Sequence, residues 1–461
     1  MAEQDPTDEM RDDDRYELDP STVRAIVEAA KSGNASLLAE LTEPVHAADI
    51  ADLLEQVGPE HREIIVRLYG QEFDGEILTE IDESIREEVM ESLAPEVLGE
   101  AVRELESDDV VDLIEDLDDA QQEVILDALE DEDRAVVEQA LRYPETSAGR
   151  LMQRELVAGP EHWTVGEAID YLRARMDLPE DFYHMILVDP AFRPTGYVTL
   201  GKLLGHRREE KLTAIAEESF RTIVVTEDEG EVAYAFNQYH LISAPVVDED
   251  GRLVGVITID DAMIVLEEEA EEDILRLAGV SDESSLADRV IATTKRRFPW
   301  LAVNLVTAIL ASLVIAMFED AISQLVALAV LMPIVASMGG NAGTQSLTVA
   351  VRAIATKDLT GANVWRVIRR EVLVGLVNGV LFAVMMGIVG VIWFGSPALG
   401  VVIAAAMVVN LVVAGLAGTV IPIVLERLRI DPALASGAFV TTVTDVVGFF
   451  VFLGLAVVVL L

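Results

Sequence analysis

The sequence predicts a multidomain protein with an all-α superhelical N-terminal domain, a pair of α/β units, an acidic connecting helix and a five-helix transmembrane domain. Three observations lead to this fold class. Apolar residues follow helical spacing in the first third of the chain, one strand–turn–strand pattern occurs twice in the middle, and the last third consists of long apolar stretches. Stretches of this length are typical of helices that cross a membrane.

The acidic residues lie almost entirely before the apolar stretches. Residues 298–461 contain seven basic and seven acidic side chains, so the whole net charge of −49 belongs to residues 1–297. Such a surface repels nucleic acid and anionic lipid headgroups, which argues against both as partners, and it attracts cations. Such a large excess of acidic over basic residues is also typical of proteins adapted to molar salt. Most of these carboxylates are therefore interpreted as solvent-exposed surface groups.

Several classes of site have no support in the composition. The chain has no cysteine, and its six histidines show no zinc-ligand spacing. No nucleophile–base pairing or phosphate-binding loop stands out, so we expect no catalytic residues and no enzyme. The first residues, MAEQDPTDEMRDDD, have no basic or apolar run that resembles a signal peptide, so the acidic half is expected to stay in the cytoplasm.

The first third of the chain is predicted to be helical. Residues 1–18 are polar and acidic and are expected to form a disordered tail. In residues 19–146 apolar side chains recur with helical spacing, as at Val110 and Leu113, and Ser107 is the expected N-cap of that helix. Several short amphipathic helices with brief connections predict a small all-α domain with an acidic surface.

Residues 147–262 contain two copies of one α/β unit. The segments HMILVDPAFRPTGYVTLGKLL and SAPVVDEDGRLVGVITIDDAM each consist of an apolar run, a turn, a second apolar run and the start of a helix. In the second copy Asp260 is a suitable helix cap. The pair therefore predicts two similar small sheets.

Residues 263–297 are expected to be an acidic helix that connects the soluble half to the membrane. Its carboxylates repel one another unless cations lie between them. A divalent cation would therefore order this helix against acidic neighbours.

Five membrane spans follow from the distribution of charge. Residues 298–318 and 321–351 contain no charge. Residues 372–425 are also uncharged and are too long for one crossing, but Gly-Ser-Pro at 395–397 divides them into two spans. Residues 432–461 supply the fifth.

Basic residues predict the orientation of these spans. Three precede the first span, five lie between the second and third, two lie between the fourth and fifth, and none occurs in the other loops. By the positive-inside rule, the protein is a multi-pass protein of the plasma membrane with a cytoplasmic N-terminus and a C-terminus outside. An odd number of spans does not divide into two equal inverted halves, so we expect a homodimer with a pore on its symmetry axis.

Asp445 lies in the middle of the last span, where a charge is costly and marks a functional site. Thr441 and Thr442 precede it by four and three residues and share its helix face. Hard cations prefer such oxygen ligands, and Mg²⁺ in particular is held by one or two carboxylates through its water shell. Ca²⁺, Mn²⁺ or a proton relay would fit the same residues.

The second span, within MPIVASMGGNAGTQSLTVA, is also polar. It contains Pro333 and paired glycines, followed by Asn341, Thr344 and Gln345. Such a segment is tolerated in a membrane only where it lines protein or water. We therefore predict that these three polar side chains line the pore.

The order of parts and two membrane motifs resemble the MgtE family of magnesium channels over nearly the full length. The motifs are MGGNAGTQS, at residues 338–346, and DPALASGAFVTTVTD, at residues 431–445. The α/β pair resembles a tandem of cystathionine-β-synthase (CBS) domains, which implies regulation and ATP as a candidate ligand. The resemblance implies a dimeric, Mg²⁺-selective channel with Asp445, Thr441, Thr442 and Gly437 at the ion site and Asp431 near the cytoplasmic mouth.

In this family the connecting helix acts as a plug whose closure is favoured by cytosolic Mg²⁺. We therefore expect regulatory Mg²⁺ among carboxylates of the cytosolic domains. The predicted ligands are Asp109, Asp112, Asp261, Glu269, Glu272 and Asp273. Two alternatives stay open: a divalent-cation exchanger coupled to Na⁺ or H⁺, and a membrane-tethered CBS sensor that conducts nothing.

Overall fold

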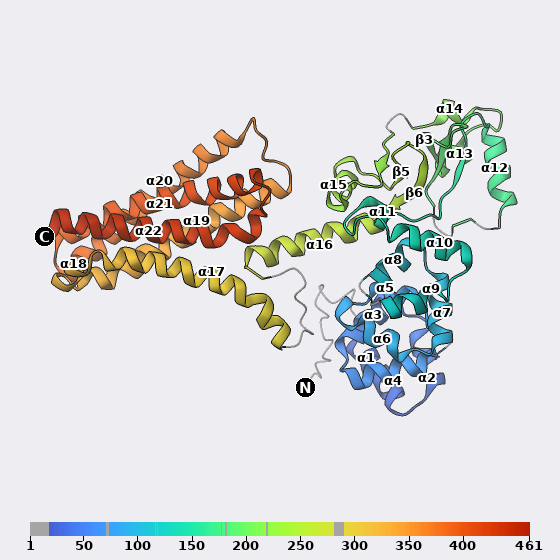
Figure 1. The fold of residues 1–461 in the computed structure, drawn as a ribbon, viewed down its shortest axis with the longest axis horizontal. Helices are drawn as coiled ribbons and strands as arrows, with labels where there is room; N and C mark the ends of the chain where they lie inside the picture. Colours follow the sequence, from blue (N-terminus) through green and yellow to red (C-terminus); the bar gives the residue numbers. More distant parts are fainter. Residues whose placement is uncertain are drawn as a thin grey trace, which may run out of the picture. The chain divides into compact units, whose positions relative to one another are not determined.

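The computed structural model describes the chain except residues 1–17, 71–72, 116, 118, 177, 180–181, 218–219 and 281–289. Nearly all of the expected acidic tail, and part of the expected connector, lie outside the described residues. The chain forms two units, Met1–Glu268 and Glu269–Leu461 (Figure 1).

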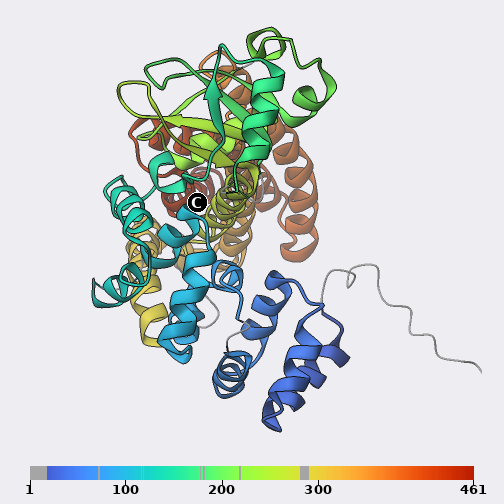
Figure 2. The ribbon, with the colours of Figure 1, turned by 90° about the vertical axis from the view of Figure 1, so that its right-hand side faces the viewer.

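Within the described residues, ten short helices form the first part of the first unit. They are α1 (Pro20–Lys31), α2 (Ala35–Thr42), α3 (Ala47–Gln56), α4 (Pro59–Tyr69), α5 (Glu76–Glu80), α6 (Glu83–Ser92), α7 (Pro95–Glu104), α8 (Ser107–Glu115), α9 (Asp119–Leu126) and α10 (Asp131–Ala140). They pack on one another as a helical stack, coloured blue to teal in Figures 1 and 2. Their apolar faces share one core, which includes the predicted Val110 and Leu113.

Some of these helices begin with a side-chain cap, but Ser107 is not one of the caps. Asp19 accepts a hydrogen bond from the backbone of Ser21 and precedes a proline in α1. Ser107, however, is already the first residue of α8, and its hydroxyl donates to Glu155 at 2.8 Å. The expected cap at Ser107 is therefore wrong, because a tertiary contact uses its side chain.

The two α/β units are structural repeats. The first contains α11 (Ala148–Leu151), β1 (Ala158–Pro160), α12 (Val165–Ala174), β2 (His184–Val188), β3 (Pro194–Thr199), α13 (Leu200–Gly205) and α14 (Leu212–Ile215). The second contains β4 (Ile223–Val224), α15 (Glu229–Tyr239), β5 (Ser243–Val247), β6 (Leu253–Thr258) and the start of α16 (Ile259–Leu277). Each sheet has a parallel pair followed by an antiparallel hairpin, with the same register shift near its end.

The start of α16 differs slightly from the expected cap at Asp260. The helix begins at Ile259, and Thr258 donates its hydroxyl proton to Asp261 at 2.6 Å. Asp260 and Asp261 thus both lie in the first turn of α16, where negative charge is favoured by the helix dipole.

The second unit contains α17 (Val290–Ala316), α18 (Glu319–Gln324), α19 (Ala327–Ala355), α20 (Val364–Phe394), α21 (Pro397–Arg427) and α22 (Pro432–Leu460). Within the described residues, five of these helices are long and apolar enough to cross a membrane. The predicted start of the second span at residue 321 is wrong. The short helix α18 occupies that stretch, and its Ser323 and Gln324 donate to the carbonyl of Asp320.

Small residues set the spacing of the membrane helices. Gly343 of α19 packs against Val440 of α22, and Gly418 of α21 packs against the carbonyl of Gly343. Asn410, fully buried on α21, donates to the carbonyl of Val335 on α19 at 2.8 Å, as expected for an interhelical bond. These contacts fix α19 and α22 side by side (Figure 1). The multidomain fold class is confirmed.

Candidate functional site

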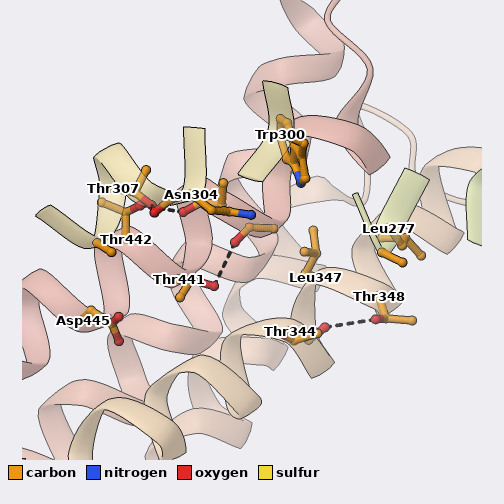
Figure 3. Close-up of a pocket in the computed structure, with 14 residues that line it drawn as sticks. Leu277, Trp300, Asn304, Thr307, Thr344, Leu347, Thr348, Thr441, Thr442 and Asp445 are labelled. Atoms are coloured by element: carbon orange, nitrogen blue, oxygen red, sulfur yellow. Dashed lines mark hydrogen bonds between the residues drawn. The ribbon is translucent and has the colours of Figure 1, made fainter. Parts of the chain in front are cut away.

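A cavity of about 400 Å³ lies within the second unit, beside α19 and α22. From α22 it is lined by Gly437, Ala438, Thr441, Thr442 and Asp445. Two other membrane helices also line it, with Thr344, Leu347 and Thr348 from α19 and Trp300, Asn304, Thr307 and Ala308 from α17. The last lining residues are Leu277, which ends α16, and Ala278, which follows it. Figure 3 shows oxygen atoms from three helices gathered around this space.

Asp445 is half-buried on the cavity wall. Within the described residues its carboxylate accepts no hydrogen bond and forms no ion pair. A carboxylate placed in an apolar span without a partner is costly, unless a cation occupies the space in front of it. The cavity beside Asp445 provides that space.

The threonine hydroxyls of the cavity are oriented as acceptors. Thr441 donates its proton to the carbonyl of Gly437 at 2.9 Å, and Thr442 donates to that of Ala438 at 2.6 Å. Thr344 donates in the same way to Gly340 at 3.0 Å. Because each proton is committed to the helix backbone, the oxygen lone pairs remain for a partner in the cavity. Such a wall suits a cation or its water shell.

The end of α16 forms part of the same cavity wall. Leu277 packs against the cluster that contains Leu347 and Val440. Gly279 follows with a φ of +72°, and a Cβ on it would lie 2.0 Å from the indole nitrogen of Trp300. Only glycine fits this left-handed position against the ring. The end of the connecting helix is therefore packed against one side of this cavity.

Asp431 is not among the residues that line this cavity. Its carboxylate instead forms an ion pair with Arg276 of α16 at 3.3 Å, and Arg276 also pairs with Glu272 at 2.7 Å. Burial, and then the charge of Asp431, raise the pKa of Asp273. Asp431 thus lies beside the connecting helix, in a group of charges at the start of α22.

Of the three polar residues predicted in the second span, only Thr344 borders the cavity. Asn341 and Gln345 are exposed on α19 but outside this cavity. The side-chain amide of Asn341 donates to the hydroxyl of Ser337 at 3.5 Å. Asn304 of α17 also lines the cavity, which only the packing of α17 could have revealed.

A second cluster of carboxylates lies in the first unit. The predicted Asp109, at the start of α8, and the predicted Asp261, at the start of α16, are brought close enough to influence each other strongly. Glu106, Asp108 and Glu155 belong to the same group. We call these five residues, with Asp260, the acidic cluster.

The electrostatics of the acidic cluster are unfavourable in the absence of a cation. Burial, and then the charges of Glu155 and Asp109, raise the pKa of Glu106 to about 7. Burial and the charge of Asp261 raise the pKa of Asp109 to about 7. Burial also raises the pKa of Asp261 to about 6 and that of Asp108 well above its usual range. A counter-cation would relieve both the burial and the repulsion.

The acidic cluster does not form a direct metal site. Among the described residues, no group of three His, Cys, Asp or Glu is arranged to coordinate a metal ion. Mg²⁺ gives up its water reluctantly and binds carboxylates through that water.

The other predicted regulatory residues are dispersed. Asp112 pairs with Arg86 at 2.9 Å but still raises the pKa of Asp109 by its charge. Glu272 pairs with Arg276, while Glu269 is exposed on α16. Sequence reasoning missed Glu106, Asp108 and Glu155, because their proximity depends on how α8 packs on the α/β pair.

Three family models match the chain. They describe a divalent cation transporter over residues 332–455, an MgtE intracellular N domain over residues 45–146, and a CBS domain over residues 214–268. The matches lie in the helical stack, in the second α/β unit and in the membrane helices from α19 to α22.

Named relatives match over most of the chain. The magnesium transporter MgtE of Thermus thermophilus is 34% identical over 438 residues, which is 94% of this chain and 97% of the relative. The magnesium transporter MgtE of Bacillus subtilis is 32% identical over 77% of this chain and 79% of the relative. A solved cytosolic domain of the Mg²⁺ channel MgtE in complex with ATP is 31% identical, covers 53% of this chain and 99% of its own, and has a TM-score of 0.49.

These relatives are named as transport proteins and not as enzymes. The matches extend through both the soluble part and the membrane helices. The chain therefore belongs to the MgtE family of magnesium transporters, as a membrane protein with five candidate spans.

Proposed function

We propose that the protein is a Mg²⁺-selective channel in which Asp445 holds a hydrated ion and cytosolic Mg²⁺ controls opening. The observation that carries this proposal is the cavity in front of Asp445, with an unpartnered carboxylate and lone pairs from Thr441 and Thr442. At about 30 Å³ per water, a cavity of about 400 Å³ has room for the octahedral water shell of Mg²⁺.

The conducting form is proposed to be a homodimer. Two Asp445 side chains across a symmetry axis would neutralise one Mg²⁺, whereas one would leave it half neutralised. In this arrangement Gly437 and Thr344 lie along the same path as Asp445, and Asp431 lies at its cytoplasmic mouth. The N-terminus is proposed to be cytoplasmic and the C-terminus outside, as the basic loops predict.

Closure is proposed to depend on Mg²⁺ at the acidic cluster. The ion would bridge the carboxylates of α8, among them Asp109, to Asp261 on α16. An ion that binds the closed form better shifts the population toward that form. Arg276 and Leu277, at the other end of α16, then hold the connecting helix beside the ion cavity. At low Mg²⁺, repulsion within the cluster favours release of the helix.

Salt concentration is expected to tune this sensor. Monovalent ions at molar concentration screen the repulsion between carboxylates that are more than about 3 Å apart. Because less repulsion is then left for Mg²⁺ to relieve, Mg²⁺ stabilises the closed form less. The midpoint of Mg²⁺-dependent protection from protease should therefore rise between low and high KCl. Identical midpoints at both KCl concentrations would contradict this part of the proposal.

ATP is the ligand proposed for the CBS pair, from the resemblance of that pair to nucleotide-binding tandems. Binding is measured by calorimetry on the full-length protein, with GTP as the comparison. Absence of heat at millimolar ATP would reject ATP as a ligand without affecting the ion path.

A flux measurement in liposomes tests the proposed function. The purified protein is reconstituted without a Na⁺ or pH gradient, and uptake of Mg²⁺, Ca²⁺ and Mn²⁺ is compared at low internal Mg²⁺. We expect Mg²⁺ uptake driven by its own gradient and weaker uptake of the other two ions. Uptake only with a Na⁺ or pH gradient would indicate a coupled exchanger, and no uptake under any gradient would indicate a non-conducting sensor.

A further inference from the structure

A groove of about 760 Å³ lies on the outer face of α20, away from the ion cavity. Its residues all belong to the start of α20, apart from one that precedes the helix. They are Ala362, Trp365, Arg366, Arg369, Arg370, Leu373, Val374, Val377 and Asn378. The groove is thus basic and aromatic at one end and apolar at the other.

The face of α20 that carries the groove is not used for packing within the chain. The opposite face holds Gly375 and Gly379, which lie against the backbone of α21, and the buried Glu371. Glu371 accepts a hydrogen bond from Ser346 at 3.0 Å and so points into the bundle. On the groove face, Trp365 is 68% exposed and Val377 is 59% exposed.

The arginines of the groove have no carboxylate partner among the described residues, although the chain contains 82 acidic side chains. The acid in the preceding loop, Asp358, accepts a hydrogen bond from Thr356 at 2.8 Å. Three adjacent guanidinium groups repel one another, so an anionic partner would stabilise Arg366, Arg369 and Arg370 together.

The depth of the groove in the membrane indicates where that anion comes from. α20 has 31 residues and is about 46 Å long, whereas a hydrocarbon core is about 30 Å thick. The first two turns of α20, with the three arginines, therefore lie at the level of the lipid headgroups. Leu373 to Val377 lie at the level of the acyl-chain segments next to those headgroups. Tryptophan at such a boundary is typical of a membrane interface.

We propose that Arg366, Arg369 and Arg370 bind the phosphate of an anionic phospholipid whose acyl chain lies along Leu373, Val374 and Val377. The site rests on the insertion of α20 in the membrane and not on ion conduction. It differs in sign from the protein as a whole, whose net charge of −49 repels anionic headgroups. The groove thus gives a strongly acidic protein one defined attachment to an acidic bilayer.

Native mass spectrometry of the detergent-purified full chain tests the site. The probes are phosphatidylglycerol and phosphatidylcholine with the same acyl chains. Wild-type protein should retain phosphatidylglycerol more strongly, and millimolar inorganic phosphate should not displace it. Equal retention of the two lipids would overturn the proposal, and so would displacement by phosphate alone.

The Arg369→Gln/Arg370→Gln variant should bind phosphatidylglycerol about thirtyfold more weakly, since each basic side chain near an anionic surface contributes roughly fivefold. The matched control, Arg352→Gln/Arg427→Gln, removes the same charge outside the groove and should bind as wild type does. Arg369→Lys/Arg370→Lys should keep most of the affinity. If the Gln variant retains the lipid but no longer forms a dimer, the face is a subunit interface and the proposal is wrong. If the Gln variant does not fold, the comparison of the two lipids on the wild-type protein and the affinity of the Lys variant decide whether the site exists.

Discussion

Thr441 and Thr444 lie on the same helix, but only Thr441 borders the ion cavity. Thr441 is exposed, and its oxygen faces the space in front of Asp445. Thr444 is fully buried, and its hydroxyl donates to the carbonyl of Val440 at 3.1 Å. The two side chains have the same chemistry, so Thr444 serves as a control for the loss of a threonine hydroxyl away from the cavity.

Replacement of Thr441 by valine is expected to lower Mg²⁺ flux about fivefold, because it removes one acceptor for the water shell at nearly constant volume. The matched variant Thr444→Val should leave flux within about twofold of wild type. Both are measured as initial uptake in liposomes. An equal loss in the two variants would show that the effect is one of folding and not of the ion path.

The helical spacing of Thr441, Thr442 and Asp445 was enough to place them on one face, since that spacing is a local property of a helix. The contributions of Asn304 and Leu277 were not predictable, because they depend on how α17 and α16 pack beside α22. Asn341 and Gln345 were predicted to line the pore from their polarity alone. Both lie outside this cavity, so their place along the pore stays a prediction.

At the scale of elements, α16 links the two candidate ion sites. Its first turn carries Asp260 and Asp261 in the acidic cluster, and its last turn carries Arg276. Both ends of this helix thus have contacts that depend on charge. A helix with such contacts at each end is suited to transmit a change at one end to the other.

Replacement of Arg276 by glutamine is expected to weaken closure. The lost pair with Asp431 is partly exposed and contributes modestly, so flux at high cytosolic-side Mg²⁺ should rise roughly twofold to fivefold. Arg276→Lys should restore most of the closure, and Arg67→Gln, which removes a surface pair with Glu63, should change nothing. Unchanged Mg²⁺ inhibition in Arg276→Gln would argue against a closing role for this pair.

The sequence predicted the repeat of the α/β units and the number of spans, because both follow from local patterns of apolar residues. It did not predict α18, because the spans were located by their lack of charge. Ser323 and Gln324 end this short helix but carry no charge, so they do not mark a boundary in the charge pattern. Asp109 and Asp261 were both among the predicted regulatory residues, but the burial of Asp108 and Glu106 beside them was not predicted. Burial of a carboxylate is a tertiary property that an amphipathic pattern does not reveal.

At the scale of the whole molecule, the acidic cluster predicts a coupling between protons and Mg²⁺. Glu106 and Asp109 have pKa values of about 7 and Asp261 of about 6 in the folded state, above the values near 4 of unfolded chains. The folded state therefore binds more protons between about pH 4 and pH 7. Its stability falls as pH rises through this window, and no further fall occurs above about pH 7.

Mg²⁺ competes with these protons, so its binding should strengthen as pH rises. The quantity to measure is the Mg²⁺ concentration that gives half-maximal protection from protease. Between about pH 6 and about pH 8 this concentration should fall about tenfold for each proton that Mg²⁺ displaces from the cluster. Glu106→Gln/Asp109→Asn should flatten this dependence, whereas Glu100→Gln, an exposed acid of α7, should not. A midpoint that does not change with pH in the wild-type protein would exclude the cluster as the Mg²⁺ sensor.

The most direct test of the ion path is Mg²⁺ uptake into liposomes by Asp445→Asn, which keeps the shape of the side chain and removes its charge. We predict that uptake falls more than tenfold at unchanged protein content, because the carboxylate is the only formal charge among the cavity residues described. The control Asp358→Asn, an exposed loop acid of the same unit, should transport as wild type does. Normal uptake by Asp445→Asn would contradict the proposed mechanism.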